Sequence, residues 1–228
     1  MDITVVGHAR ASVKPERATL HLLAGFESGD KSDALTRTTT LVGKLQAQIS
    51  ALEGAGVSPI TWHAVLPVQT RAYRPYSDKG AVLPQRHLAE SRLKVKFRDF
   101  EALSQFAAQV GGAAGVTLQY VEWALTEVSQ TYLRAQVLTQ AVEDAKTRAT
   151  AIAKAAGAQG VTPLEIADPG LLSNVTSSGP VGAHVQAAAM RGGPVGFSGK
   201  VAGDEQGIDL APEDVVIEAE VHARYTTT

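Results

Sequence analysis

The chain opens with an alternation of apolar and polar side chains. Between Ala18 and Phe26 every even position is apolar, and most odd positions are polar or small. A period of two is typical of a β-strand with one buried face. The stretch from Ile3 to Glu27 therefore predicts two opening strands.

Three later segments carry apolar residues at steps of three and four, the spacing of one helical face. They are residues 31–53, 100–110 and 129–156. Polar residues that favour N-caps precede or open them: Asp30 or Ser32, Asp99, and Ser129. Glycines follow each segment as stop signals. The apolar stripe of the last helix is mostly alanine, which allows a sheet or another helix to approach it closely.

Alternation returns in segments that predict further strands: residues 60–74, 87–98, 116–127, 164–167 and 215–225. In the first of these, even positions from Ile60 to Val68, Trp62 among them, form the apolar face. Pro67 removes a ladder hydrogen bond, so this strand is expected at an edge or with a bulge. The apolar phase of residues 116–127 shifts from even to odd positions, which indicates a bulge or burial on both faces.

The element order is β-β-α-β-β-α-β-α-β-β, without strict alternation of strand and crossover helix. It predicts an α+β fold, in which an antiparallel or mixed sheet carries helices on one face. Residues 1–228 are expected to form a single domain. Between about 169 and 212 the chain is rich in Gly, Pro and Ser and shows little periodicity, which is typical of a functional or flexible loop.

Composition describes an ordinary soluble protein. Hydrophobic residues make up 44% of the chain, and 21 Lys plus Arg stand against 23 Asp plus Glu. That balance provides no net field for nucleic acid or an anionic membrane, and no apolar run approaches the roughly 20 residues of a membrane span. Met1 and Asp2 lead directly into a strand, so we expect a cytoplasmic protein. A periplasmic or secreted location is the alternative if a leader was removed.

No catalytic motif stands out. The six histidines include no pair at i, i+4 and no His-Glu-x-x-His, and we interpret them as ordinary surface side chains. Ser198 lacks the spacing of a nucleophile elbow, and the glycines around it do not follow a phosphate-binding pattern. We therefore assign no catalytic, cofactor-binding or metal-binding residue and expect no cofactor.

A basic row marks one side of the strand at 87–98: Arg92, Lys94, Lys96 and Arg98. A basic sheet face with exposed aromatic residues is typical of proteins that bind single-stranded nucleic acid. Because Phe97 points to the opposite face, we interpret the row as a solvated strand surface that discourages edge pairing. No nucleic-acid partner is expected.

The end of the hairpin formed by residues 60–74 and 87–98 is rich in tyrosine and arginine. These residue types are enriched in interface hot spots. They form our candidate interaction patch: Arg71, Tyr73, Arg74 and Tyr76. An ordinary polar hairpin tip is the alternative interpretation.

Two strand motifs and one helix motif resemble a known family. The first runs Val5-Val-Gly7 and then Val13-Lys-Pro-Glu-Arg-Ala-Thr-Leu20, the second runs from Ala89 to Asp99, and an alanine-rich helix stops at Gly157. Together they resemble the bacterial SIMPL-domain family over nearly the whole chain. Departures from the family pattern, such as Glu16 in place of aspartate, concern turns rather than core positions.

The resemblance implies a modest function. The family includes a periplasmic immunogenic protein and envelope proteins linked to oxidative stress, it has no established catalytic site, and at least one member resembles a ring or channel-like homo-oligomer. We therefore interpret the chain as a non-enzymatic, self-associating scaffold or binding protein, with an envelope or stress link implied by the family. The alternative is a small-molecule-binding protein or enzyme with a pocket under the 169–212 loop.

Overall fold

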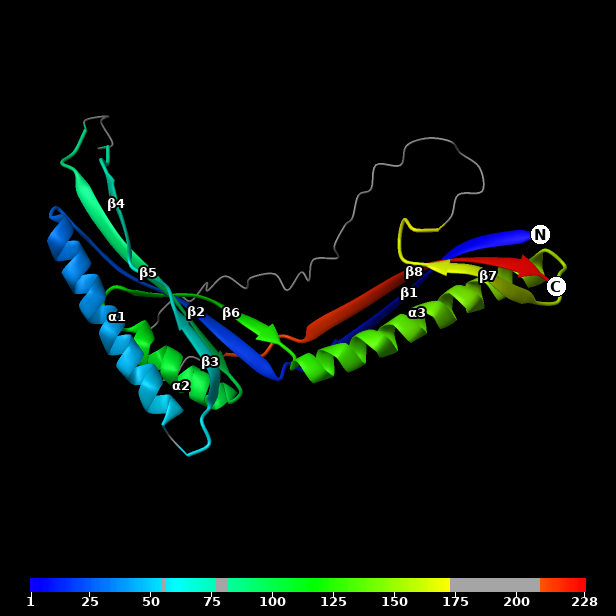
Figure 1. Cartoon of the computed structure of the whole chain (residues 1–228), viewed down its shortest axis with the longest axis horizontal. Coiled ribbons are helices and arrows are strands. Elements are labelled where there is room, and N and C mark those ends of the chain that lie inside the picture. Colours follow the sequence, from blue (N-terminus) through cyan, green and yellow to red (C-terminus); the bar gives the residue numbers. More distant parts are fainter. Residues whose placement is uncertain (55, 77–81, 173–209) are drawn as a thin grey trace. The chain divides into compact units, whose positions relative to one another are not determined.

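The structure is a computed structural model that describes residues 1–54, 56–76, 82–172 and 210–228 (Figure 1). The chain divides into two compact units. Unit 1 contains Met1–Lys14, the described part of Leu125–Gly192, and Asp214–Thr228, while unit 2 contains Pro15–Ala124 and the described part of Gly193–Glu213. Both ends of the chain thus contribute to unit 1. The expectation of a single domain over residues 1–228 stays a prediction.

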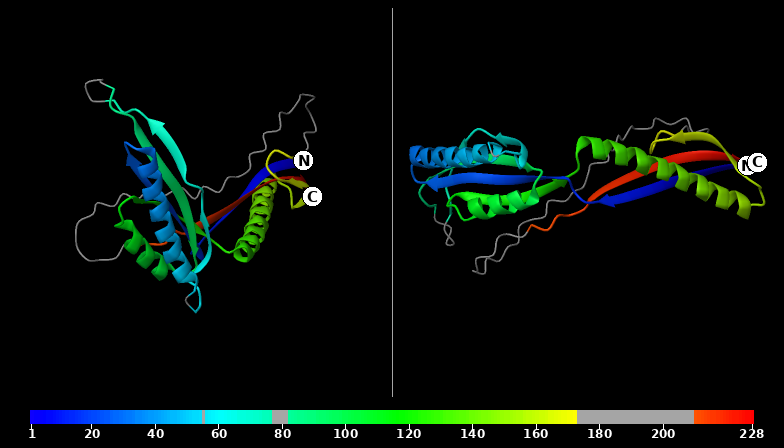
Figure 2. Two further views of the ribbon diagram at one scale, coloured as in Figure 1. Left: turned by 60° about the vertical axis from the view of Figure 1, so that its left-hand side comes forward. Right: turned by 90° about the horizontal axis from the view of Figure 1, so that it is seen from below.

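Unit 1 is a three-stranded antiparallel sheet with one long helix. Its strand order is β1-β8-β7, with β1 at Asp2–Val13, β7 at Val161–Ala167 and β8 at Val215–Thr227. Helix α3, Glu127–Ala155, runs alongside β1 and β8 on one face of this sheet (Figure 2). The opposite face of the unit 1 sheet carries mainly polar side chains, including Thr4, His8 and Arg10 of β1.

The helix of unit 1 approaches its sheet closely because alanines line the contact. Ala141, Ala145, Ala149 and Ala153 are fully buried against the strands. Opposite them Gly7 has no side chain, and a Cβ there would lie only 2.0 Å from the backbone oxygen of Ala141. The close approach expected from the alanine stripe is confirmed.

Unit 2 has the element order β-α-β-β-α-β, counting β3 and β4 as one interrupted strand. Its elements are β2 (Arg17–Ser28), α1 (Lys31–Glu53), β3 (Ile60–Val65), β4 (Gln69–Tyr73), β5 (Arg86–Phe97), α2 (Phe100–Gly111) and β6 (Val116–Ala124). The strands are antiparallel in the order β3-β5-β2-β6, and β4 also pairs with β5. This is the split β-α-β arrangement of ferredoxin-like folds.

Both helices of unit 2 pack on the same face of its sheet. Apolar residues of α1 and α2 share one core with the inward residues of β2 and β5. Each helix begins at a predicted aspartate cap. The Asp30 carboxylate accepts from the backbone N–H of Ser32 and Asp33, and the Asp99 carboxylate accepts from two N–H groups in the same way. The predicted α+β class, with helices on one face of antiparallel sheets, is confirmed.

The predicted strand at 60–74 is wrong in two details. It is interrupted around Pro67 into β3 and β4, both on one edge of β5, which agrees with the edge position expected from that proline. A register shift between Ile60 and Trp62 then reverses the side-chain alternation. Trp62 therefore lies 47% exposed on the face away from the helices rather than on the apolar face.

The start and the stripe of α3 also differ from the sequence prediction. Thr126, not Ser129, is the N-cap, and its hydroxyl accepts from the backbone N–H of Ser129. The apolar spacing of the sequence predicts Ile152 in the stripe after Ala149. The buried stripe instead keeps its step of four residues from Val137 to Ala153, so Ala153 is buried and Ile152 is 46% exposed. The bulge expected in residues 116–127 is confirmed by the register shift between β2 and β6.

The predicted loop at 169–212 lies mostly outside the described residues. Residues 173–209, with Ser198 among them, are not described, and residues 169–172 and 210–212 adopt neither helix nor strand. Within the described ranges, no helix is long and apolar enough to cross a membrane.

Candidate functional site

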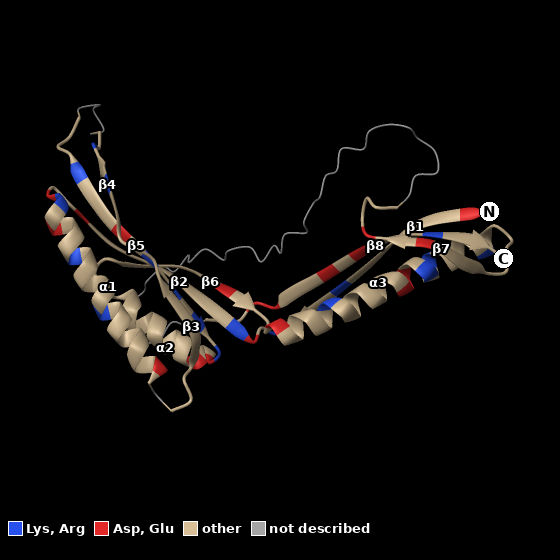
Figure 3. Ribbon diagram, viewed as in Figure 1, with Lys and Arg blue, Asp and Glu red and all other residues tan. Residues whose placement is uncertain are grey.

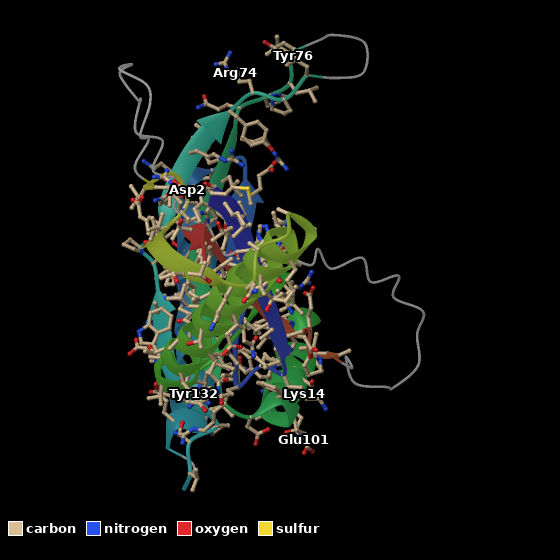
Figure 4. The ribbon with its side chains drawn as sticks, turned by 90° about the vertical axis from the view of Figure 1, so that its right-hand side faces the viewer. Asp2, Lys14, Arg74, Tyr76, Glu101 and Tyr132 are labelled. Carbon is tan, nitrogen blue, oxygen red and sulfur yellow. The ribbon has the colours of Figure 1, made fainter. Side chains whose placement is uncertain are left out.

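The predicted interaction patch lies at and beyond the end of β4. Arg71 and Tyr73 are two residues apart in strand β4, so their side chains share one side of the hairpin. Arg74 and Tyr76 follow near the tip (Figure 4). Tyr76 is 71% exposed and its backbone forms an isolated bridge with Val82. The structure thus divides the patch into a strand pair and a tip pair.

Tyr73 is tied to its own unit through a carboxylate. Its hydroxyl donates to Oε2 of Glu27 at 2.6 Å, and Nε of Arg86 donates to Oε1 of the same carboxylate at 2.6 Å. The hydrogen bond from Tyr73, followed by that from Arg86, lowers the pKa of Glu27, while the same Tyr73–Glu27 bond raises the pKa of Tyr73. Glu27 therefore links the end of β2 to both arms of the hairpin.

Pairing in register places Arg71 and Tyr73 on the sheet face opposite α1 and α2, which we call the helix-free face. Residues directly opposite each other on antiparallel strands point to the same side, and Arg71 pairs with Leu88 and Tyr73 with Arg86. The same alternation along β5 brings the basic row to this face: Arg92, Lys94 and Lys96. Arg98, the fourth member, follows the end of the strand. The patch and the row are thus parts of one surface.

Two aromatic side chains that the sequence did not associate with the basic row lie on the same face. Trp62 pairs with Lys96, whose Nζ lies 5.8 Å from the centroid of the indole ring. Tyr120 belongs to β6, which pairs with the edge of β2 opposite β5, and lies on the same face as the row. The even position of Trp62 predicted the wrong face, because the bulge after Ile60 cannot be recognised in the sequence pattern. The phase change in residues 116–127 is the one signal that pointed to Tyr120.

His21 occupies the centre of the helix-free face and is only 6% exposed. Its ring stacks on Tyr120 with centroids 4.2 Å apart, and its Nε2 lies 3.3 Å from a carboxylate oxygen of Glu122. Burial lowers the pKa of His21, and nearby Lys94 lowers it further, against the opposing effect of the Glu122 carboxylate. The expectation that all six histidines are ordinary surface residues is wrong for His21, because Tyr120 covers its ring.

Three further histidines lie close to carboxylates of their own unit. His63 lies 2.7 Å from Glu53 of α1, and His8 and His222 lie 3.7 and 3.1 Å from the Glu220 carboxylate. Among residues 1–54, 56–76, 82–172 and 210–228, no group of three or more acidic or histidine side chains is placed to hold a metal ion.

The helix-free face therefore combines three kinds of group that suit binding. It presents cationic side chains on β5, aromatic rings on β3 and β6, and a tyrosine–carboxylate–arginine cluster where the hairpin begins. Cations and aromatic rings recognise partners through ion pairs, hydrogen bonds and ring contacts.

A comparison with protein families agrees with this fold and with the motifs of the chain. The model of the family SIMPL, described as a protein of unknown function (DUF541), matches residues 3–225. No curated protein matches the chain. The family resemblance inferred from the strand and helix motifs is confirmed over nearly the whole sequence.

Proposed function

We propose that the chain, which belongs to the SIMPL family, is a non-enzymatic scaffold or binding protein that associates with itself through the β4–β5 hairpin. The observation that carries this proposal is the exposure of β4, in which every residue is exposed. The envelope and oxidative-stress link implied by the family is part of the same proposal.

The free edge of β4 supports association through strand pairing. Within the described residues β4 pairs with β5 alone, so its second edge presents backbone N–H and C=O groups to a partner. Such an edge is a template for another strand. Two copies that pair β4 with β4 in antiparallel fashion form a closed, two-fold symmetric contact.

The side chains around that edge suit an interface. Arg71 and Tyr73 flank the edge, while Arg74 and Tyr76 extend it toward the tip. Tyrosine and arginine bring large contact areas and hydrogen bonds to interface centres. The Glu27 carboxylate holds Tyr73 in place, which reduces the entropy that this side chain loses on association.

Self-association is tested with gel filtration and light scattering of the full chain. We expect an oligomer that Tyr76→Glu weakens, because the substitution places a charge in the contact. It removes no hydrogen bond between the Tyr76 side chain and another described residue. The matched control is Tyr132→Glu, which makes the same substitution at a similarly exposed tyrosine (62% exposed) in α3 of unit 1. A wild-type protein that stays monomeric at all concentrations contradicts the proposal, as does equal weakening by both substitutions.

A further inference from the structure

The two units differ in how charged side chains are paired on the sheet face that carries no helix. Figure 3 marks the acidic and basic residues along the strands of unit 1. On the sheet face opposite α3, arginine and histidine side chains lie close to carboxylates. The contacts are Arg10 with Glu218 at 3.5 Å, Arg224 with Glu165 at 3.6 Å, and His8 and His222 with Glu220 at 3.7 and 3.1 Å. Both arginines of these strands thus have a carboxylate of the same unit within 4.0 Å.

On the helix-free face of unit 2 the basic row is not matched. Across β2, the residues opposite Arg92, Lys94 and Lys96 are neutral or nearly so: Leu23, His21 and Thr19. On the β3 side, Ala64 lies opposite Lys94 and Trp62 opposite Lys96. Among the residues that the structure describes, none of these three cations has a carboxylate within 4.0 Å.

Such a row costs stability in the isolated protein. Arg92, Lys94 and Lys96 are like charges at alternate positions of one strand, about 7 Å apart on the same face. Their mutual repulsion is relieved when opposite charges are brought to the face. The ion pairs of unit 1 have no counterpart along the basic row of unit 2. A feature that costs stability in this way is expected where the protein binds a partner.

We propose that the row of Arg92, Lys94 and Lys96 binds an acidic, extended polypeptide segment of a partner protein, lying along β5. An extended segment repeats its side chains on one face at the same spacing of about 7 Å, so carboxylates at alternate positions meet the three cations in register. The inference names the partner class of the binding role proposed above and rests on that role.

The carboxylates beside the row favour a polypeptide over single-stranded nucleic acid. Bases stack on open ring faces, and one face of the Tyr120 ring is occupied by His21, while Lys96 Nζ lies 5.8 Å from the centroid of the Trp62 ring. Glu90 and Glu122 lie on the same face beside the row. A continuous phosphate backbone meets these carboxylates, whereas spaced acidic side chains avoid them.

The test is fluorescence anisotropy with the full chain and a labelled peptide of alternating glutamate and threonine. We expect binding that weakens as salt rises. Replacing Arg92, Lys94 and Lys96 together by glutamine weakens it about 10-fold or more, since three charge pairs are lost. The matched control replaces Lys44, Arg134 and Lys146 by glutamine, which removes the same charge from exposed helix positions elsewhere.

Four outcomes overturn the inference, three of them in the binding assay and one in light scattering. A control variant that loses affinity as much as the row variant shows attraction by net charge alone. A peptide of the same composition, with its glutamates in one block, that binds as tightly excludes the strand-spaced contact. Tighter binding of an oligothymidylate shows a nucleic-acid surface. Light scattering of the row variant separates the two proposals: loss of peptide binding in an intact oligomer supports the row, and loss of the oligomer assigns the row to a second copy instead.

Discussion

Gly7→Ala examines the contact on which unit 1 depends. The added Cβ lies 2.0 Å from the backbone oxygen of Ala141 and 2.7 Å from the Cβ of Ala145. Both atoms belong to the rigid framework of α3, so no side-chain rotation relieves the overlap. The helix must move away from β1 by about 1 Å or more before the contact becomes tolerable.

The cost follows from that displacement. Overpacking a tight contact costs about 1–3 kcal/mol, and a gap of about 0.5–1 Å along a packed face forfeits a quarter to a half of its dispersion energy. The buried alanines at 145, 149 and 153 all lie on the displaced face. The dispersion energy lost along this face adds about 2 kcal/mol, and the gain of about 0.5–1 kcal/mol that alanine has over glycine in a strand is subtracted. We therefore expect a net loss of about 2–4 kcal/mol.

Urea unfolding followed by circular dichroism measures this loss. With a slope of about 2 kcal/mol/M, the midpoint falls by about 1–2 M. Gly43→Ala is the matched control, because Gly43 lies exposed inside α1 and no atom is within 4 Å of the added Cβ. Alanine there raises helix stability by about 0.5–1 kcal/mol. A Gly7→Ala protein that unfolds at the wild-type midpoint refutes the reasoning.

Three further predictions concern unit 2. Thr38→Val leaves the Phe26 N–H and the Ala89 carbonyl without the buried hydroxyl that bridges them at 3.1 and 3.0 Å. We expect it to lower the free energy of unfolding in urea by about 1–3 kcal/mol, whereas Thr40→Val, at an exposed position, changes it by no more than about 0.5 kcal/mol. Equal losses in the two variants contradict this. Because the pKa of His21 is lowered in the folded state, the unfolded chain takes up its proton first, and stability falls as pH drops below about 6.5. His21→Gln removes this contribution, so the urea midpoint of the variant falls less between about pH 7 and pH 5 than that of the wild type. An equal fall in both proteins contradicts the prediction. Tyr73→Phe raises the pKa of Glu27 toward its ordinary value, as NMR titration of the carboxyl group measures, whereas Tyr132→Phe leaves it unchanged; a Glu27 titration unaffected by Tyr73→Phe is the contrary result.

Local patterning was sufficient for most elements of this fold. The alternation around Leu20, the spacing in α1 and the aspartates at 30 and 99 each act over a few residues, so they are legible in the chain itself. Thr38 illustrates the boundary. Its place on the inward face of α1 follows from the helical spacing within residues 31–53, but its hydrogen-bond partners on β2 and β5 belong to distant segments.

The candidate surface was predictable only in part. The basic row and the tyrosines and arginines of the hairpin are adjacent in sequence, so they were found. Trp62 was assigned to the wrong face, since a single extra residue in a strand reverses every following side chain. The contacts of His21 with Tyr120 and Glu122 join strands about a hundred residues apart, and no local period records such a pairing.

The amino-acid pattern of this protein thus determines its helices, most of its strands, its family and the residue types available for binding. Tertiary structure decides which of those residues meet. It sets Gly7 against the alanines of α3 and turns Trp62 toward Lys96. Within the described part of the chain it also leaves three cations of β5 with no carboxylate within 4.0 Å, while Arg10 and Arg224 of unit 1 are paired. The physical reason is that periodicity is a property of neighbouring residues, whereas register, bulges and charge pairing depend on strands that come together only when the chain folds.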